Sequence, residues 1–269
     1  MRDRGKASKL AALGLGFELV EGDMTSPESL RRAVVGCDTV IHLVAIRQGP
    51  REQFQRIMEQ GTRDLVEAAK AAGVRRFVLM SVLGTSEATK DLVPYFHAKW
   101  TMEQTVAGSG LEHVIFRPSF IFGADGGILP TFKKLAKLTP VTPITGNGEQ
   151  RIQPIWVDDV AAYFSAAVDK PEAANRTFEL GGPDVVTWNE LWQRIRAALG
   201  IRRRPTVHLP TSLMRIPATV TERLPGNIPL TRDLLTMLET GYNVVTNDDA
   251  VQTFKLPLAP LDEQLRRAA

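Results

Sequence analysis

The 269-residue sequence predicts a doubly wound α/β protein, in which helices cover both faces of a parallel sheet. The first observation is that short apolar runs alternate with helical patterns through the first two-thirds of the chain. Helical connections of about ten or more residues join parallel strands by right-handed crossovers. The second is a composition of 43% hydrophobic and 23% charged residues, which excludes a disordered or fibrous chain.

The predicted strands are short, apolar and separated by helices. They cover Phe17–Glu21, Thr39–Val44, Arg76–Met80, His113–Phe116 and Arg176–Leu180. The predicted helices have apolar residues at helical spacing, and Ser26, Gly73 and Thr187 supply start and stop signals. These helices cover Pro27–Val35, Glu52–Ala72, Pro94–Ala107, Ile128–Lys137, Trp156–Val168 and Trp188–Leu199.

Two domains are expected from this order of elements. Residues 1–170 make the nucleotide-binding type of α/β domain, to which the chain returns at about 176–182. Residues 183–269 make a small, mainly helical substrate lobe, interrupted by prolines at 205, 210, 217, 225 and 229. Ligands of open α/β sheets bind at the carboxyl edge of the strands, so we expect the lobe to lie there.

Charge and cysteine content exclude several classes of function. The excess of 33 basic over 30 acidic residues is too small to predict nucleic-acid binding. Cys37 is the single cysteine, and it and the histidines show no metal-ligand spacing, so we expect neither disulfide nor metal. With no apolar run of about 18 residues and no signal peptide, a cytoplasmic protein is expected. The basic run Arg202–Arg204 leaves open a weak peripheral association with the inner face of a membrane.

The sequence Tyr95-Phe-His-Ala-Lys99 is the sharpest candidate for chemistry. Positions i and i+4 share one helix face, and an ammonium beside a phenol is expected to lower the pKa of the phenol. Tyr95 is therefore a candidate general acid or base. Ser81 follows the strand Arg76–Met80, where its hydroxyl can bind the same substrate oxygen. A solvent-exposed Tyr–Lys pair on a helix remains the alternative.

Several segments carry a family resemblance in the same order along the chain. They are Val20–Thr25, Asp38–Leu43, Gly73–Val78 with Ser81, Tyr95–Lys99, Phe116–Gly123, Gln153–Ala161, Phe178–Pro183, Leu230–Leu234 and Phe254–Leu258. Together they resemble the atypical, extended short-chain dehydrogenase/reductases. Within these, the chain is similar to the subgroup of the dehydrogenase-like accessory subunit of respiratory complex I and the NmrA-like proteins. The resemblance implies a Rossmann-type fold that binds NAD or NADP.

The resemblance also implies roles for particular residues. Ser81, Tyr95 and Lys99 would form the catalytic set, with Lys99 also holding the nicotinamide ribose. The implied cofactor-binding residues are Asp23 and Met24 by the adenine, His42, Leu43 and Val44 beside the phosphates and ribose, and Pro118, Ser119 and Phe120 beside the nicotinamide. Simpler roles stay open, namely a turn at Asp23, a hydrogen-bonded core histidine at His42 and a strand end at Pro118.

The family's first strand, Gly-rich turn and following helix have no counterpart here. Gly14-Leu-Gly16 is not followed by a correctly spaced third glycine. That turn binds the pyrophosphate at a helix N-terminus, so we expect weak dinucleotide binding without it. Either the start was assigned too late and Met1 stands for an internal position, or the chain is truly truncated. Either way the strand Thr39–Val44 is expected to have an open edge.

Two functions follow from the resemblance. The first is an NAD(P)-dependent oxidoreductase, or an epimerase-like relative, that acts on a carbonyl or alcohol with Tyr95 exchanging the proton. The second is a non-catalytic NAD(P)H-binding accessory or redox-sensing protein, which implies a possible association with a respiratory complex. Arg2 and Arg4 favour NADP weakly, because arginines near the second strand can bind a 2′-phosphate. The substrate is a small molecule of unknown identity.

Overall fold

The computed structural model describes residues 14, 16–202, 204–210 and 231–269. It forms two compact units. The first unit comprises residues 1–81, 86–115 and 173–176, and the second comprises 82–85, 116–172 and 177–269. Arg2 and Arg4, which favour NADP in the sequence, lie outside the described residues.

The main sheet is parallel, as the sequence predicts, and in the described residues it has four strands in the order β1-β2-β3-β8. Its strands are β1 (Thr39–His42), β2 (Arg76–Met80), β3 (Glu112–Pro118) and β8 (Arg176–Leu180). Thr39 pairs with Arg76 and His42 with Leu79, so the carboxyl ends of β1 and β2 are level. Within the described residues β1 pairs with β2 alone.

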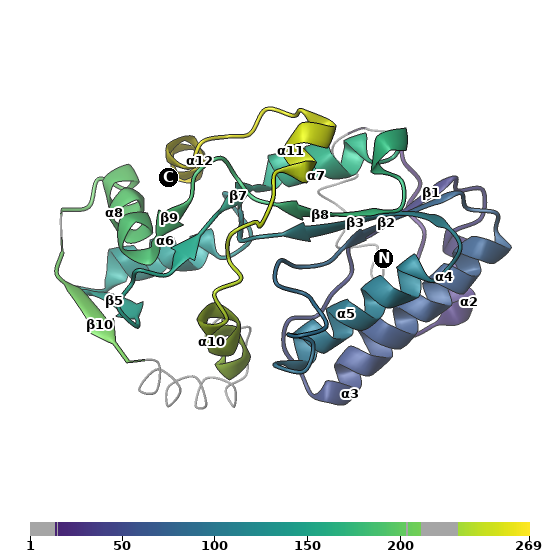
Figure 1. Ribbon diagram of the computed structural model, residues 1–269, viewed down its shortest axis with the longest axis horizontal. Helices are drawn as coiled ribbons and strands as arrows, with labels where there is room; N and C mark the ends of the chain where they lie inside the picture. The colour runs from purple at the N-terminus through teal and green to yellow at the C-terminus, as the bar shows by residue number, and fades with distance from the viewer. Residues whose placement is uncertain (1–13, 15, 203, 211–230) are drawn as a thin grey trace. The chain divides into compact units, whose positions relative to one another are not determined.

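Helices of the first unit pack together over one apolar core (Figure 1). They are α2 (Pro27–Ala33), the continuous run α3 (Arg51–Gln53), η2 (Phe54–Gln60) and α4 (Gly61–Ala71), and α5 (Pro94–Ala107). Phe54, Phe77 and Met102 are fully buried in this core. The sequence predicts one helix over Glu52–Ala72, and the middle of that helix, η2, has the wider π geometry.

One predicted strand is absent from the described residues, and one predicted helix start is present without a side-chain cap. Phe17–Glu21 belongs to no strand among the described residues, and Phe17 is exposed. A β-strand is stabilised by a neighbouring backbone, and none of the sheets formed by the described residues includes this segment. Ser26 does stand at the N-cap of α2, but its side chain makes no capping hydrogen bond. The backbone carbonyl of Ser26 instead accepts from the Ser29 hydroxyl at 2.8 Å.

The second unit combines helices with three two-stranded sheets. The sheets pair β4 (Ile121–Phe122) with β7 (Ile155–Trp156), β5 (Thr142–Thr145) with β10 (Thr206–Leu209), and β6 (Arg151–Ile152) with β9 (Val186–Thr187). The helices are α6 (Leu129–Leu138), α7 (Val157–Ala166), α8 (Trp188–Ala198), α10 (Arg232–Glu239), α11 (Asp249–Phe254) and α12 (Leu261–Ala268), and a short 3-10 turn, η3 (Pro171–Ala173), follows α7.

Strand β3 supplies apolar side chains to the cores of both units. Ile115 is buried in the core of the first unit. Phe116 contacts the rings of Phe164, Phe178 and Phe254 in the second. Neighbouring residues of a strand point to opposite faces, so Ile115 and Phe116 contact different sets of side chains. Among the described residues, no helix is both long and apolar enough to span a bilayer.

Candidate functional site

Lys99 is the centre of a buried polar cluster in the first unit. It lies on α5, is only 1% exposed, and its Nζ donates to the carbonyl oxygen of Met80 at 2.6 Å. Met80 is the last residue of β2, so the ammonium is tied to the carboxyl end of that strand. Burial lowers the pKa of Lys99 to about 8, although the carboxylate of Glu103 acts in the opposite direction.

Tyr95 lies next to Lys99, as the helical spacing predicts. The Nζ of Lys99 is 5.8 Å from the centre of the Tyr95 ring. The other side of the environment is apolar, with the Phe54 ring edge-on at a centroid distance of 6.5 Å. The predicted lowering of the tyrosine pKa is wrong, because burial raises the pKa of Tyr95 to about 12 and only the charge of Arg47 opposes this.

His42, at the end of β1, is a hydrogen-bonded core histidine. It is buried, and its Nε2 lies 3.1 Å from the Thr62 hydroxyl on α4. Burial, and then the charge of Lys99, lower the pKa of His42 to about 3. The ring is therefore neutral at physiological pH and leaves the positive charge of the cluster to Lys99.

The residues that follow β1 and β2 differ in exposure. Leu43 and Val44 are 52% and 46% exposed, although both are apolar. Ser81 is buried directly after β2, one residue from the carbonyl that Lys99 binds. The carboxyl ends of β1 and β2 are level. Exposed apolar side chains therefore follow β1, and the buried hydroxyl of Ser81 follows β2.

Asp23 and Met24 form a turn before α2. The Asp23 carboxylate accepts from the backbone N–H and the hydroxyl of Thr25, at 2.8 and 2.7 Å. Met24 is buried against Gly61, where an added Cβ would come within 2.8 Å of the Met24 carbonyl oxygen. This close approach of turn and helix requires a glycine at position 61. The turn that the sequence offers as the simpler role of Asp23 is therefore present.

Pro118, Ser119 and Phe120 follow one another in the second unit. The Pro118 carbonyl accepts from the N–H of Leu83 at 3.0 Å, and the Ser119 N–H donates to Leu180 at 2.8 Å. The Ser119 hydroxyl donates to the carbonyl of Asn243 at 3.2 Å. Phe120 lies edge-on to Trp188, with ring centres 5.8 Å apart. Their implied place beside a nicotinamide remains a prediction.

Glu103 and Arg47 act on the Tyr95–Lys99 pair, although the sequence does not single them out. Glu103 is buried one helical turn after Lys99, and the i,i+4 spacing of opposite charges is a signal that could have revealed it. Arg47 acts on Tyr95 from a loop, and no sequence pattern predicts that approach. In the second unit, Trp188 and Trp192 of α8 line a pocket.

The residues of the first unit suit the nicotinamide–ribose end of a dinucleotide. An ammonium carries three N–H donors, so the bond from Lys99 to Met80 leaves donors for ribose hydroxyls. The exposed side chains of Leu43 and Val44 offer apolar contact to a flat ring. Within the described residues no group of three or more His, Cys, Asp or Glu side chains could hold a metal ion.

A parallel sheet with level carboxyl strand ends and a buried lysine beside them defines a Rossmann-like α/β protein of the nucleotide-binding class. The model of an NAD(P)H-binding family matches residues 1–171. The chain belongs to this NAD(P)H-binding family.

Its curated relatives include reductases and a respiratory-complex subunit. The chain is 32% identical over 198 residues to ceramide reductase of Caulobacter vibrioides, which covers 73% of this chain and 61% of the relative. It is 30% identical over 172 residues to the mitochondrial NADH dehydrogenase (ubiquinone) 1 alpha subcomplex subunit 9 of Arabidopsis thaliana, covering 63% of this chain and 42% of the relative. The chain thus spans about half the length of these relatives.

Solved structures show the same fold at low sequence identity. An NADPH-dependent quinone oxidoreductase of Escherichia coli, complexed with NADPH, matches with a TM-score of 0.77 at 20% identity. The match covers 98% of this chain and 87% of the oxidoreductase chain. A Citrobacter triphenylmethane reductase complexed with NADP(H) matches with a TM-score of 0.73 at 20% identity, and the match covers 100% of this chain and 88% of the reductase chain. These similarities concern the fold.

Proposed function

We propose that the chain binds NAD(P)H and reduces a carbonyl group, with Tyr95, Lys99 and Ser81 as the catalytic set. One observation carries the proposal: the buried ammonium of Lys99 lies between the end of β2 and the Tyr95 ring. Membership of the NAD(P)H-binding family supports it, as do reductases among the relatives.

The proton chemistry of the proposal follows from the pKa values. A bound nicotinamide supplies the hydride. With a pKa of about 12, Tyr95 is protonated at neutral pH and donates its proton to the carbonyl oxygen as negative charge develops there. Ser81 donates a hydrogen bond to the same oxygen. Lys99 is mostly charged below pH 8 and stabilises the resulting phenolate, so the rate of reduction falls above pH 8.

The test measures turnover by the full chain with NADPH and a panel of aldehydes and ketones. The loss of NADPH absorbance reports the rate. Tyr95→Phe is expected to lower kcat by about 100-fold or more, with the Kd for NADPH unchanged, because only the proton donor is removed. The matched control is Tyr242→Phe, which removes a hydroxyl from a side chain that is 49% exposed. Unchanged turnover in Tyr95→Phe would overturn the mechanism.

A second candidate is a non-catalytic NAD(P)H-binding accessory protein of a membrane-bound electron-transfer complex. Relatives named as a mitochondrial NADH dehydrogenase subunit and as a photosystem II assembly factor favour it. Tight NADPH binding without turnover on the whole carbonyl panel would select this candidate over the reductase.

We further propose that the chain prefers NADPH to NADH, because Arg2 and Arg4 can bind a 2′-phosphate, and that it is cytoplasmic. Comparing the dissociation constants of NADPH and NADH tests the cofactor preference.

A further inference from the structure

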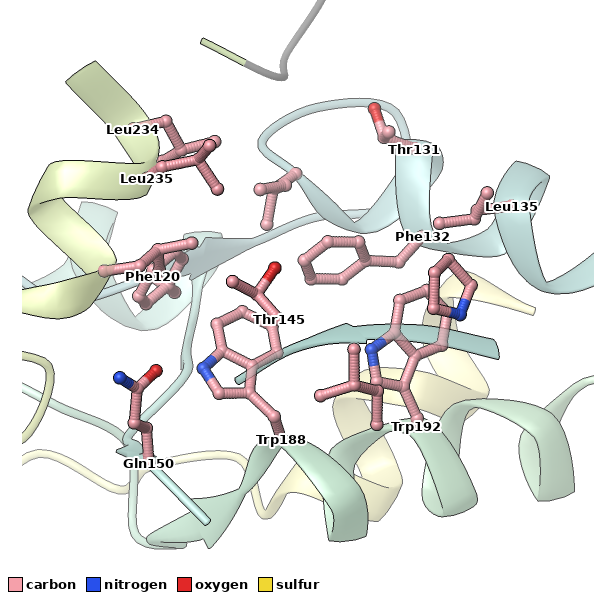
Figure 2. Close-up of a pocket in the computed structure, with 14 residues that line it drawn as sticks. Phe120, Thr131, Phe132, Leu135, Thr145, Gln150, Trp188, Trp192, Leu234 and Leu235 are labelled. Carbon is pink, nitrogen blue, oxygen red and sulfur yellow. The ribbon is translucent and has the colours of Figure 1, made fainter. Parts of the chain in front are cut away.

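The second unit contains an apolar pocket that the proposed reaction does not use. Its volume is 420 Å³, which is within the range of small-molecule sites. Phe120, Phe132, Trp188, Trp192, Leu135 and Leu235 supply most of its wall, and the polar lining residues are Thr131, Thr145 and Gln150 (Figure 2). Among the residues that the structure describes, no lining side chain carries a charge.

The aromatic side chains form a continuous row. Phe120 contacts Trp188 with ring centres 5.8 Å apart, and Trp188 contacts Phe132 at 5.7 Å. Phe132 in turn contacts Trp192 at 5.2 Å. Trp188 and Trp192 are one turn apart on α8, so the row runs along that helix. The pocket wall is therefore elongated in one direction.

The polar residue Gln150 marks one end of the row. The carbonyl of Gln150 accepts from the N–H of Trp188 at 3.2 Å, which fixes Gln150 beside the first residue of α8. In Figure 2, Gln150 and Phe120 lie on one side of the view and Trp192 and Leu135 on the other. An occupant can thus meet the Gln150 amide at one end and mostly apolar side chains along the rest, where Thr131 and Thr145 add two hydroxyl groups.

We propose that this pocket binds a single alkyl chain that ends in an uncharged polar group. The elongated apolar wall suits the chain, and the Gln150 amide suits a hydroxyl or carbonyl oxygen. The described lining residues include no charged side chain, which disfavours a fatty-acid carboxylate. Trp188 and Trp192 are then ligand-contacting residues. Phe120 is common to this pocket and to the implied nicotinamide site, whereas Tyr95, Lys99 and Ser81 are not among the lining residues. The tests therefore measure binding without NADPH, so that their failure and the failure of the proposed reaction are distinguishable.

The first test titrates the full chain, without NADPH, with straight-chain alcohols from hexanol to decanol. Calorimetry measures the dissociation constant of each alcohol. Burying one more methylene is expected to tighten binding by about fourfold until the pocket is full. An affinity that does not depend on chain length would overturn the proposal. So would tighter binding of 2-naphthol than of decanol, because the pocket would then select flat rings.

Two substitutions on α6 form a matched pair. Leu135→Arg places a charge in the pocket lining, whereas Leu138→Arg places the same charge on a side chain that is 70% exposed on the same helix. We expect Leu135→Arg to weaken decanol binding at least tenfold and Leu138→Arg to leave it unchanged. Thr145→Leu fills pocket volume without adding charge and should weaken decanol binding more than hexanol binding. Wild-type decanol affinity in both Leu135→Arg and Thr145→Leu would refute the site.

Discussion

In the first unit, burial and charge shift the pKa values of Lys99 and His42 and so determine which of the two is protonated at neutral pH. Lys99 keeps its proton below about pH 8. His42 is neutral unless the pH falls to about 3, because burial and the charge of Lys99 both lower its pKa. Two cations in one buried cluster would repel each other without water to screen them. The neutral His42 therefore permits a charged Lys99 beside Tyr95.

The acid sensitivity of His42 is measurable as stability. Since its pKa is lowered to about 3, the unfolded chain binds a proton below pH 6.5 that the folded chain does not. The free energy of unfolding should thus fall as the pH falls from 6.5 toward 3, by about 1.4 kcal/mol per pH unit from this residue. His42→Gln should remove that part of the slope in urea unfolding between pH 7 and 4. The same substitution at the exposed His208 is the control, and equal slopes in wild type and His42→Gln would contradict the argument.

The limits of sequence prediction at this scale are clear for Tyr95. The i,i+4 spacing correctly brings Lys99 to its side, because helix geometry alone determines that distance. The direction of the pKa shift depends on what buries the phenol, and Phe54 comes from a helix about forty residues away by chain. Spacing carries no information about such burial, so the predicted direction was wrong.

At the scale of elements, α8 has the clearest sequence signal and the most direct consequence for the proposed pocket. Thr187 and Glu190 form a capping box, in which the Thr187 hydroxyl accepts from the Glu190 N–H at 3.1 Å and the Glu190 carboxylate accepts from the Thr187 N–H at 2.8 Å. The cap satisfies N–H groups that the first turn would leave free. It therefore anchors the turn that carries Trp188.

Removing this cap should destabilise the protein. Thr187→Ala is expected to lower the free energy of unfolding by about 1 kcal/mol, measured by denaturant titration. Glu190→Gln keeps an acceptor at the same place and should cost much less. If both substitutions cost the same, or if Thr187→Ala costs nothing, the box does not stabilise α8 as argued.

Elements whose signals are local are predicted well. The helix Pro94–Ala107 agrees residue for residue, since Pro94 begins it and Gly108 follows it. The strand β10 pairs with β5, more than sixty residues earlier, and neither strand is predicted, because a short strand is defined by its partner. The π geometry of η2 is likewise invisible to a pattern that records only apolar spacing.

At the scale of the whole molecule, the two proposed ligands are assigned to different units. Residues 1–171 match the NAD(P)H-binding family, and the buried lysine cluster belongs to the first unit. The apolar pocket lies entirely in the second unit, where its lining comes from α6, α8 and α10 among others. Each unit has its own apolar core, so each can respond to a ligand of its own.

Hydrogen exchange can separate these responses in one sample. A ligand at about 100 times its Kd stabilises the binding-competent state by about 2.7 kcal/mol, which slows exchange of amides that open with the site. Saturating NADPH should therefore slow exchange at residues 43–47, after β1, and at residues 80–81. Decanol should instead slow exchange at residues 188–192 of α8. If NADPH slows exchange at neither of the first two segments, the proposed cofactor placement fails, whatever the pocket in the second unit binds.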